Sequence, residues 1–315
     1  MAEVKKMATR EGYGAALVEL GEKNKDFIVM DADLAAATKT GMFKKAFPER
    51  FYNCGIAEQN MMGIAAGIAS TGKRVIVSSF AMFASGRAFE QIRNSIGYPQ
   101  LNVIIGATHA GISVGEDGAT HQCCEDIALM RTIPGMTIIN PADAVEAKKA
   151  VYAAMEHNGP VYMRFGRLAV PVVFDDDYTF EIGKGVELKA GNDVTVIATG
   201  LMVAEAMEAY DILKAEGINA RIINMATIKP LDKDIVLKAA KETGAIVTAE
   251  EHSVIGGLGS AVSELICEQY PVPVLKLGVN DTFGTSGPAV QLLDEFGLRA
   301  KNIAEMAKKA ISLKK

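Results

Sequence analysis

Two histidines and an aspartate lie within one short glycine-rich stretch, between Ile105 and Gln122. His109 and His121 are two of only four histidines in the 315 residues, and Asp117 lies between them. A histidine can shuttle protons near neutral pH and can bond to phosphate oxygens or sugar hydroxyls, and an aspartate accepts hydrogen bonds from hydroxyls. The stretch therefore predicts a site for a hydroxylated or phosphorylated ligand.

Two other interpretations of this stretch stay open on these residues alone. Two histidines and an aspartate could ligate a metal ion, which requires fixed ligand spacing and further groups that orient the ligands. In a solvated loop, the same histidines would bond only to nearby backbone groups. The secondary structure around the stretch helps to distinguish a ligand site, a metal site and a solvated loop.

The sequence around the stretch predicts alternating strands and helices. A short apolar run over 101–105 precedes the stretch and predicts a buried strand that opens into a loop. Similar strands are predicted at 26–30, 74–78 and 161–165, with helical patterns between them. Such alternation favours a parallel sheet with helices on both faces, and ligands bind at the carboxyl ends of strands in such sheets.

The alternation lapses after Val170 and resumes near Asp193. We therefore predict two α/β domains, each a mostly parallel sheet with helices on both faces. The first domain is expected over residues 1–170, a linker over 171–190, and the second domain over 191–315.

Composition excludes several classes of function. The net charge is −5, which gives no basic surface for nucleic acid. No apolar run reaches the roughly 18 residues that a membrane span needs, so no membrane partner is expected. The N-terminus has no apolar signal core and the four cysteines form no Cys-x-x-Cys pair, so a cytoplasmic protein with reduced thiols is predicted.

Other candidate residues lie outside the histidine-containing stretch. Glu58 begins an apolar, glycine-rich helical pattern. Burying its carboxylate there would cost several kcal/mol unless the group is paired or bonded to a ligand. The alternative is an ordinary carboxylate at a helix N-terminus, which the helix dipole favours.

Phe80 and Phe83 share one helical element, where aromatic rings serve either as core or as a stacking surface for a planar ligand. Arg164 is expected at the carboxyl end of a buried strand. A guanidinium there suits anion capture, and a surface salt bridge is the alternative.

Taken together, these stretches resemble the C-terminal half of transketolase, a thiamine-diphosphate enzyme. The resemblance runs from about residue 8 to the C-terminus, and the order of its motifs makes it specific. The motifs are Gly-Ile-Ala-Glu58-Gln-Asn-Met, Phe80-Ala-Met-Phe83, and Thr108-His109 through Gly115-Glu-Asp117-Gly-Ala-Thr-His121-Gln. The resemblance implies a pyrimidine-binding domain followed by a C-terminal domain.

The resemblance also implies roles in binding thiamine diphosphate. Glu58 would bond to a ring nitrogen of the aminopyrimidine and act as a catalytic residue. Phe83 would stack on the pyrimidine, with Phe80 and Asp33 nearby. The carbanion chemistry itself belongs to the cofactor.

Sugar phosphates are the implied substrates. His109 and Arg164 would hold the phosphate, with Arg10 as a further candidate. His121, the second catalytic residue, and Asp117 would face the hydroxyls of the donor.

Two departures from the family pattern stand out. Transketolases often carry a serine that touches the substrate phosphate where this chain has Ala37, so Thr38 or Lys39 is expected to take its place. The Gly-Asp-Gly motif that binds Mg²⁺ and the diphosphate occurs nowhere in the 315 residues. We therefore expect no metal site here and a partner N-terminal subunit that carries the motif, with two copies of each chain in an α2β2 assembly.

Three rivals remain. Deoxyxylulose-phosphate synthase and the β chain of a 2-oxoacid dehydrogenase share the glutamate and the C-terminal domain. The paired His109 and His121 favour transketolase over both. A non-catalytic module of the same fold would have no need of Glu58 together with both histidines.

Overall fold

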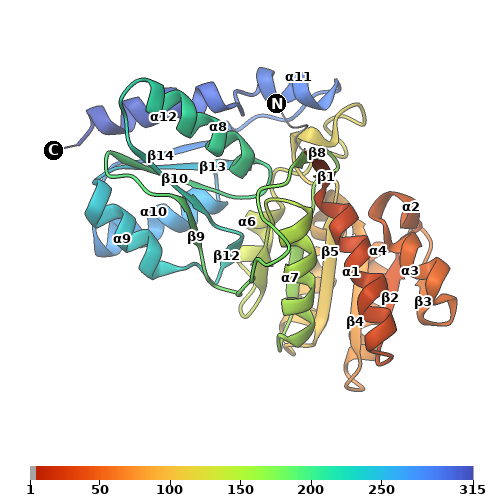
Figure 1. The fold of residues 1–315 in the computed structure, drawn as a ribbon. Helices are drawn as coiled ribbons and strands as arrows, with labels where there is room; N and C mark the ends of the chain where they lie inside the picture. The colour runs from red at the N-terminus through yellow and green to blue at the C-terminus, as the bar shows by residue number, and fades with distance from the viewer. Residues whose placement is uncertain (1–4, 315) are drawn as a thin grey trace.

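The computed structural model describes residues 5–314, which form two α/β units that lie side by side (Figure 1). This is the fold class that the alternating pattern predicts. The helices and strands, in chain order, are β1 Lys6–Ala8, α1 Thr9–Lys23, β2 Phe27–Asp31, α2 Ala35–Thr38, α3 Thr40–Ala46, β3 Phe51–Asn53, α4 Glu58–Ala69, β4 Arg74–Phe80, α5 Phe89–Gln91, β5 Val103–Thr108, α6 Asp126–Arg131, β6 Thr137–Ile139, α7 Ala144–Glu156, β7 Val161–Arg164, β8 Ala169–Pro171, β9 Val186–Lys189, β10 Val194–Ala198, α8 Met202–Ala215, β11 Ala220–Asn224, β12 Thr227–Lys229, α9 Lys233–Thr243, β13 Ile246–Ser253, α10 Leu258–Gln269, β14 Val274–Val279, α11 Ala289–Glu295 and α12 Ala300–Ser312.

The first unit is built on a seven-stranded sheet in the order β12-β6-β7-β5-β4-β2-β3. All neighbouring pairs are parallel except the pair between β12 and β6. Helices α1 and α7 pack on one face through Tyr13, Leu17 and Val151, and α4 and α6 cover the other. Its central strands are buried apolar runs, as expected when both faces of a sheet are covered.

The second unit is built on a five-stranded sheet in the order β14-β13-β10-β11-β9. Four of the strands are parallel, and β9 adds an antiparallel edge. Helices α8 and α12 contribute to the core on one face of the sheet, and α9 and α10 to the core on the other. The unit therefore repeats the layered architecture of the first.

The chain between the two units is more structured than a free linker. Within the predicted linker of residues 171–190, β9 pairs with β11 of the second sheet. β8 pairs with β1 at the start of that range. In the other direction, β12 leaves the second unit to pair with β6 at the edge of the first sheet. The domain boundaries at residues 170 and 190 stay a prediction.

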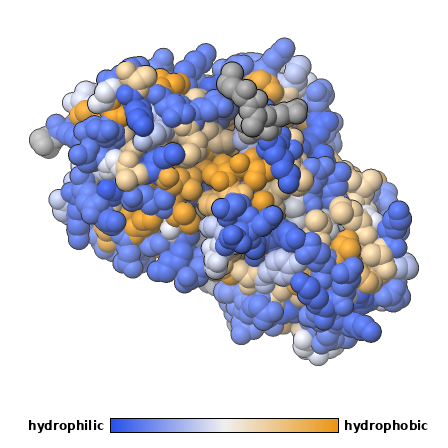
Figure 2. All heavy atoms as spheres, in the orientation of Figure 1, coloured by the Kyte–Doolittle hydropathy of each residue, from blue (hydrophilic) through white to orange (hydrophobic). Residues whose placement is uncertain are grey.

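The face drawn in Figure 2 is mostly hydrophilic, with hydrophobic residues gathered near its middle, where the two units adjoin. Within residues 5–314, no helix combines the length and apolar character that a membrane crossing requires. The cytoplasmic location stays a prediction.

Candidate functional site

Four neighbouring parallel strands of the first sheet end at one edge and gather most of the candidate residues. β2, β4, β5 and β7 are adjacent, and their pairing aligns Asp31 with Ser78, Phe80 with Thr108, and Ala107 with Arg164. Loops that leave this edge carry the histidines. The geometry is that of ligand sites in open α/β sheets, which lie beyond the carboxyl ends of the strands.

Glu58 is the first residue of α4, and its side chain is only 1% exposed. Nη1 of Arg87 donates to both carboxylate oxygens, at 2.9 and 2.8 Å. The guanidinium of Arg87 also lies over the ring of Phe83, 4.9 Å from its centroid, while half of the Arg87 side chain is exposed. The buried carboxylate of Glu58 is thus separated from solvent by the half-exposed side chain of Arg87.

An aromatic cluster joins Phe80 and Phe83 to both histidines of the opening stretch. Phe80 stacks on His109 with ring centroids 3.8 Å apart, and on Phe83 at 5.8 Å. The ring of His121 meets Phe83 edge-on at 5.2 Å. Phe80 and His109 are buried, whereas Phe83 and His121 are only partly buried. The cluster therefore has a packed base, formed by the first pair, and an accessible rim, formed by the second.

His109 is buried and its hydrogen bonds define its tautomer. Nη1 of Arg10 lies 3.0 Å from Nε2, and Oγ1 of Thr108 lies 2.9 Å from Nδ1. Arginine can only donate, so Nε2 accepts and Nδ1 carries the proton that it donates to Thr108. Burial, followed by the positive charges of Arg10 and Arg167, lowers the pKa of His109 to about 3. The ring is therefore neutral at neutral pH.

Several cations converge on this histidine. Arg10 contacts the ring directly, and the positive charges of Arg167 and Lys39 also contribute to lowering the pKa of His109. Nη1 of Arg10 also donates to the carbonyl of Ala37 at 2.9 Å, while its Nε is buried without a hydrogen-bond partner among the described residues. The arrangement has the charge to hold an anion beside a neutral imidazole.

The remaining candidates in this region lie on exposed loops. Asp117 is exposed, between Gly115 and Gly118, which both have positive φ. Asp33 is also exposed, with φ of 66°, and accepts a hydrogen bond from Asn53 at 2.7 Å. Both carboxylates are open to solvent on loops that follow strands of this sheet.

Of the two expected replacements for the missing serine, Thr38 is committed elsewhere. It is fully buried, and its hydroxyl donates to Asp31 at 2.7 Å. Lys39 is partly exposed, with φ of 71°, and pairs with Glu11 at 3.8 Å. Lys39 is therefore the better placed of the two for an anion.

The structure does not bring Arg164 to the other candidates. Its side chain is 3% exposed, and Nε donates to Asp126 at 2.9 Å. Nη2 donates to the carbonyls of Cys123 and Glu251. Burial disfavours the charged form, but Asp126 and Glu251 raise the pKa of Arg164 above its ordinary value. The expectation that Arg164 holds a substrate phosphate does not fit this position, because the side chain is buried and both Nε and Nη2 already donate to protein oxygens.

Arg167 and Arg87 are the residues that sequence reasoning missed. Arg167 follows Arg164 by three positions, donates to Glu116 at 2.9 Å and to the carbonyl of Val114, and is 39% exposed. The repeat of arginine in Arg-Phe-Gly-Arg was a usable signal for it. No sequence signal tied Arg87 to Glu58, which lies 29 positions away.

Within the described part of the chain, no group of three or more His, Cys, Asp or Glu side chains could hold a metal ion. The site on these residues therefore consists of a buried carboxylate, an aromatic cluster, two histidines and several cations.

Family models match most of the chain. The model of the transketolase pyrimidine-binding domain matches residues 5–172, and that of the transketolase C-terminal domain matches residues 183–303. A protein described as a transketolase C-terminal section from Methanocaldococcus jannaschii is 53% identical, with 94% of each chain covered. A 6-deoxy-6-sulfo-D-fructose transketolase subunit of a Clostridium species is 42% identical, over 95% of this chain and 92% of its own length.

A solved structure of a split-gene transketolase, described as an inactive β4 tetramer, is similar in both sequence and fold. It is 56% identical, covers 98% of this chain and all of its own, and superposes with a TM-score of 0.92. The chain therefore belongs to the transketolase family, as the section that comprises the pyrimidine-binding and C-terminal domains.

Proposed function

We propose that this chain is one subunit of a split transketolase, which transfers a two-carbon ketol unit from a ketose phosphate to an aldose phosphate with thiamine diphosphate as cofactor. One observation carries the proposal. Contacts run without a break from Glu58 through Arg87 and the aromatic cluster to His109 and Arg10. This row combines a carboxylate, stacking rings, imidazoles and cations on one sheet edge, as a cofactor and a sugar phosphate side by side would require.

The residues present fit the pyrimidine part of the cofactor. Glu58 offers a buried carboxylate to a ring nitrogen and would hold a proton there. Phe83 offers a partly exposed ring for stacking, with Phe80 behind it, and Asp33 faces the same edge. When bound, thiamine diphosphate supplies the carbanion chemistry of ketol transfer. Arg87 contacts both Glu58 and Phe83, so its side chain has to move when the aminopyrimidine ring binds between them.

We assign the sugar phosphate to the cationic end of the row. Arg10 contacts His109, Arg167 and Lys39 contribute further positive charge at this ring, and their combined charge suits a dianionic phosphate. His109 stays neutral there and, by accepting a hydrogen bond from Arg10, orients that guanidinium towards the phosphate without adding to the charge. Charge-assisted bonds from arginine to phosphate give both affinity and orientation.

His121 and Asp117 are assigned to the hydroxyls of the donor sugar. Nδ1 of His121 lies 3.0 Å from the hydroxyl of Thr120, so Nε2 is assigned to the substrate. A histidine at this position can accept a proton from a substrate hydroxyl and return it. Asp117, on the exposed loop, would accept a hydrogen bond from a second hydroxyl.

The diphosphate and Mg²⁺ are assigned to a partner subunit that carries a Gly-Asp-Gly motif, in an α2β2 assembly. The surface beside Glu58 supports an interface. Ile56 is 80% exposed and Ile64 is 41% exposed. A Cβ at Gly63 or Gly67 would meet nothing within 4 Å in the described part of the chain. This apolar, small-residue face of α4 can receive another chain closely.

The nature of the substrate anion is a second question. The Clostridium relative is described as acting on a 6-deoxy-6-sulfo-D-fructose. A sulfonate and a phosphate are both oxyanions that Arg10 and Arg167 can hold, so the same site admits either class of ketose. We propose phosphates as the main substrates because a dianionic phosphate matches the combined positive charge of Arg10, Arg167 and Lys39 better than a monoanionic sulfonate does.

The test is to assay ketol transfer from xylulose 5-phosphate to ribose 5-phosphate with thiamine diphosphate and Mg²⁺. The chain is assayed alone, the presumed partner alone, and the two together. We expect turnover only in the mixture. A sulfoketose donor in the same assay measures the alternative substrate class, and an inactive mixture with every donor would rule out the proposed reaction.

A further inference from the structure

The end of strand β13 extends from the second unit into the base of the loop that carries both histidines. We call residues 109–122 the histidine loop. Glu250, Glu251 and His252 follow one another on β13, and all three side chains are buried. Successive side chains of a strand point to opposite faces, so neighbours here serve different parts of the molecule.

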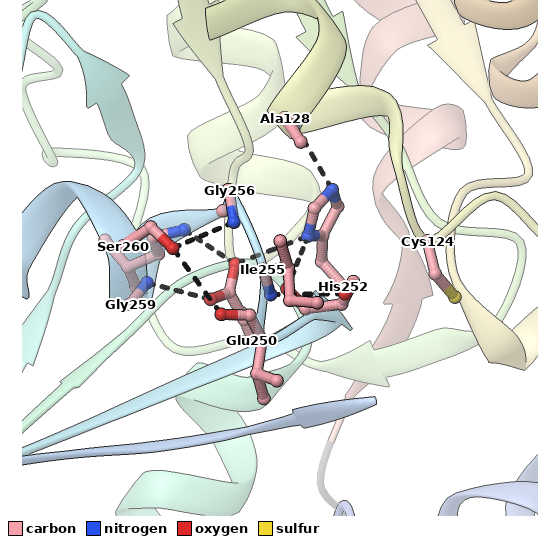
Figure 3. A network of polar contacts seen from close by, with 12 residues as sticks. Cys124, Ala128, Glu250, His252, Ile255, Gly256, Gly259 and Ser260 are labelled. Atoms are coloured by element: carbon pink, nitrogen blue, oxygen red, sulfur yellow. Dashed lines mark hydrogen bonds and ion pairs between the residues drawn. The ribbon is translucent and has the colours of Figure 1, made fainter. Parts of the chain in front are cut away.

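Glu250 points into its own unit. Its carboxylate accepts from the backbone N–H groups of Leu258 and Gly259, at 2.7 and 2.8 Å, and so caps the start of α10 (Figure 3). His252 points to α6 of the first unit, where its Nε2 accepts from the N–H of Ala128 at 3.4 Å. Burial lowers the pKa of His252 to about 4, so this ring is neutral and serves as an acceptor.

Glu251 points into the histidine loop. Its Oε1 accepts from the N–H of Ser113 at 2.5 Å. A Cβ built at Gly111 would overlap the carboxyl group of Glu251, so the loop backbone lies directly against it. Gly111 also has φ of 83°, which strongly favours glycine. The backbone of the histidine loop at Gly111 and Ser113 therefore packs directly on the carboxylate of Glu251.

The base of the loop is closed on the same side. The N–H of Gly111 donates to the carbonyl of Cys123 at 2.8 Å. Arg164 donates to the carbonyls of Cys123 and Glu251 at 3.1 and 2.9 Å. The buried pair of Arg164 and Asp126 thus fixes the strand that carries Glu251 against the end of the loop.

A second anchor lies on the segment that precedes α11. Nε2 of Gln122 donates to the carbonyls of Ile112 and Thr285, at 3.0 and 2.9 Å. A Cβ at Gly284 would overlap the Gln122 side chain, so the two chains are in close contact. The loop is therefore held by the second unit at both Ser113 and Gln122.

We propose that Glu251 is a positioning residue, through which the second unit fixes the histidine loop and so sets the places of His109 and His121. The consequence rests on the proposed function, because the histidines matter for the reaction only if they contact its substrate. Glu251 touches neither substrate nor cofactor; it acts through the backbone of Ser113 and Gly111.

Glu250 provides a matched control for the test. It is adjacent, equally buried, and burial raises the pKa of each carboxyl group to about 7. It differs only in what it bonds. The variants Glu251→Ala, Glu251→Gln and Glu250→Ala are to be compared in the complex with the partner subunit.

The first readout is hydrogen exchange in that complex, which needs no catalytic activity. Glu251→Ala should speed exchange at the Ser113 amide and in residues 109–114, and Glu250→Ala at Leu258 and Gly259 instead. Glu251→Gln keeps an oxygen acceptor for Ser113 and should restore much of the protection. Unchanged exchange over residues 109–114 in Glu251→Ala would overturn the proposal, whatever reaction the complex catalyses.

The second readout is steady-state kinetics. Glu251→Ala should raise KM for the ketose phosphate about tenfold, with thiamine diphosphate affinity unchanged, since a lost bond to a charged acceptor displaces the substrate-binding loop. Glu250→Ala should leave KM within about twofold. If Glu251→Ala does not assemble, Glu251→Asp, which shortens the side chain by one methylene, replaces it and should show a smaller rise in KM. Equal effects of Glu250→Ala and the Glu251 variant on KM would contradict a positioning role.

Discussion

The sheet edge of the first unit and the junction between the two units use the same residue types for opposite purposes. At the edge, Arg87 covers Glu58 with half of its side chain in solvent. At the junction, Arg164 covers Asp126, and both are buried almost completely. The first pair can open to a ligand without exposing the core, and the second cannot.

The two buried histidines repeat this contrast. His109 and His252 both have pKa values lowered by burial, to about 3 and about 4. His109 stacks on Phe80 beside the accessible rim of the aromatic cluster, whereas His252 bonds to Ala128 between the units. A lowered pKa therefore does not by itself identify a site residue; the access of its neighbours to ligand does.

The largest effect is expected where the junction is broken. Arg164→Met leaves Asp126 as a buried, unpaired charge and should lower the free energy of unfolding by about 3–5 kcal/mol. Denaturant unfolding of the purified chain measures it. Arg167→Met is the matched control, because its partner Glu116 is exposed, and it should cost under about 1 kcal/mol. Equal losses in both variants would remove the distinction between the two arginines.

The next largest effect concerns the carboxylate at the edge. Glu58→Gln in the reconstituted complex should lower kcat about 100-fold, because a neutral amide cannot exchange a proton with the cofactor. Initial rates of product formation at saturating substrate measure kcat. Glu49→Gln, an exposed glutamate paired with Arg50, is the control and should be neutral. Near-normal turnover of Glu58→Gln would remove its assigned role.

A smaller effect is expected at the cationic end. Arg167→Ala should raise KM for a phosphorylated ketose about tenfold, the loss of one charge-assisted hydrogen bond. Its effect on a non-phosphorylated, uncharged ketose such as erythrulose should be below about twofold. Initial-rate kinetics with both donors measures the ratio, and a parallel rise in both KM values would show that Arg167 does not select the anion.

The last effect builds up gradually over about two pH units and is a pH dependence of stability. The pKa of His109 is about 3 in the folded chain against 6.5 for the free side chain, so the unfolded chain binds more protons between these values. Stability from this group is present above pH 6.5 and is lost as pH falls, by about 1.4 kcal/mol per pH unit. Unfolding of the wild type and of His109→Gln should therefore converge as pH falls from 6.5 to 4.5, and parallel profiles would contradict a neutral buried ring.

The sequence predicts the parallel strands of both units because short apolar runs that alternate with helical patterns are typical of buried strands. It could not foresee β12, which is three residues long and pairs with a strand some ninety positions earlier. Such an edge strand depends on long-range contacts rather than on its own pattern. The single helical element predicted for Phe80 and Phe83 is wrong for Phe80, which ends strand β4. The helical segment after it contains two π-helical turns, Met82–Arg87 and Ile92–Gly97, that local periodicity does not reveal.

Glu58, Phe83 and His109 could be proposed from residue type and local pattern, and the structure brings them into one row of contacts, but their roles stay predictions. Sequence could not foresee which way the side chains of Arg164 and Arg167 point, because the two residues are only three positions apart at one strand end. Only the structure shows that Arg164 turns to Asp126 and Arg167 to the exposed loop. Side-chain direction beyond the last residue of a strand is set by what packs there, and the second unit supplies that packing.

The most direct test of the central proposal is a titration. This chain is added to a fixed amount of the partner subunit, with thiamine diphosphate and Mg²⁺ in excess, and ketol transfer is measured at each ratio. We predict no turnover from either chain alone and a rise that stops at equimolar amounts, because each active site needs both chains. Turnover by this chain without the partner would contradict the split-subunit account.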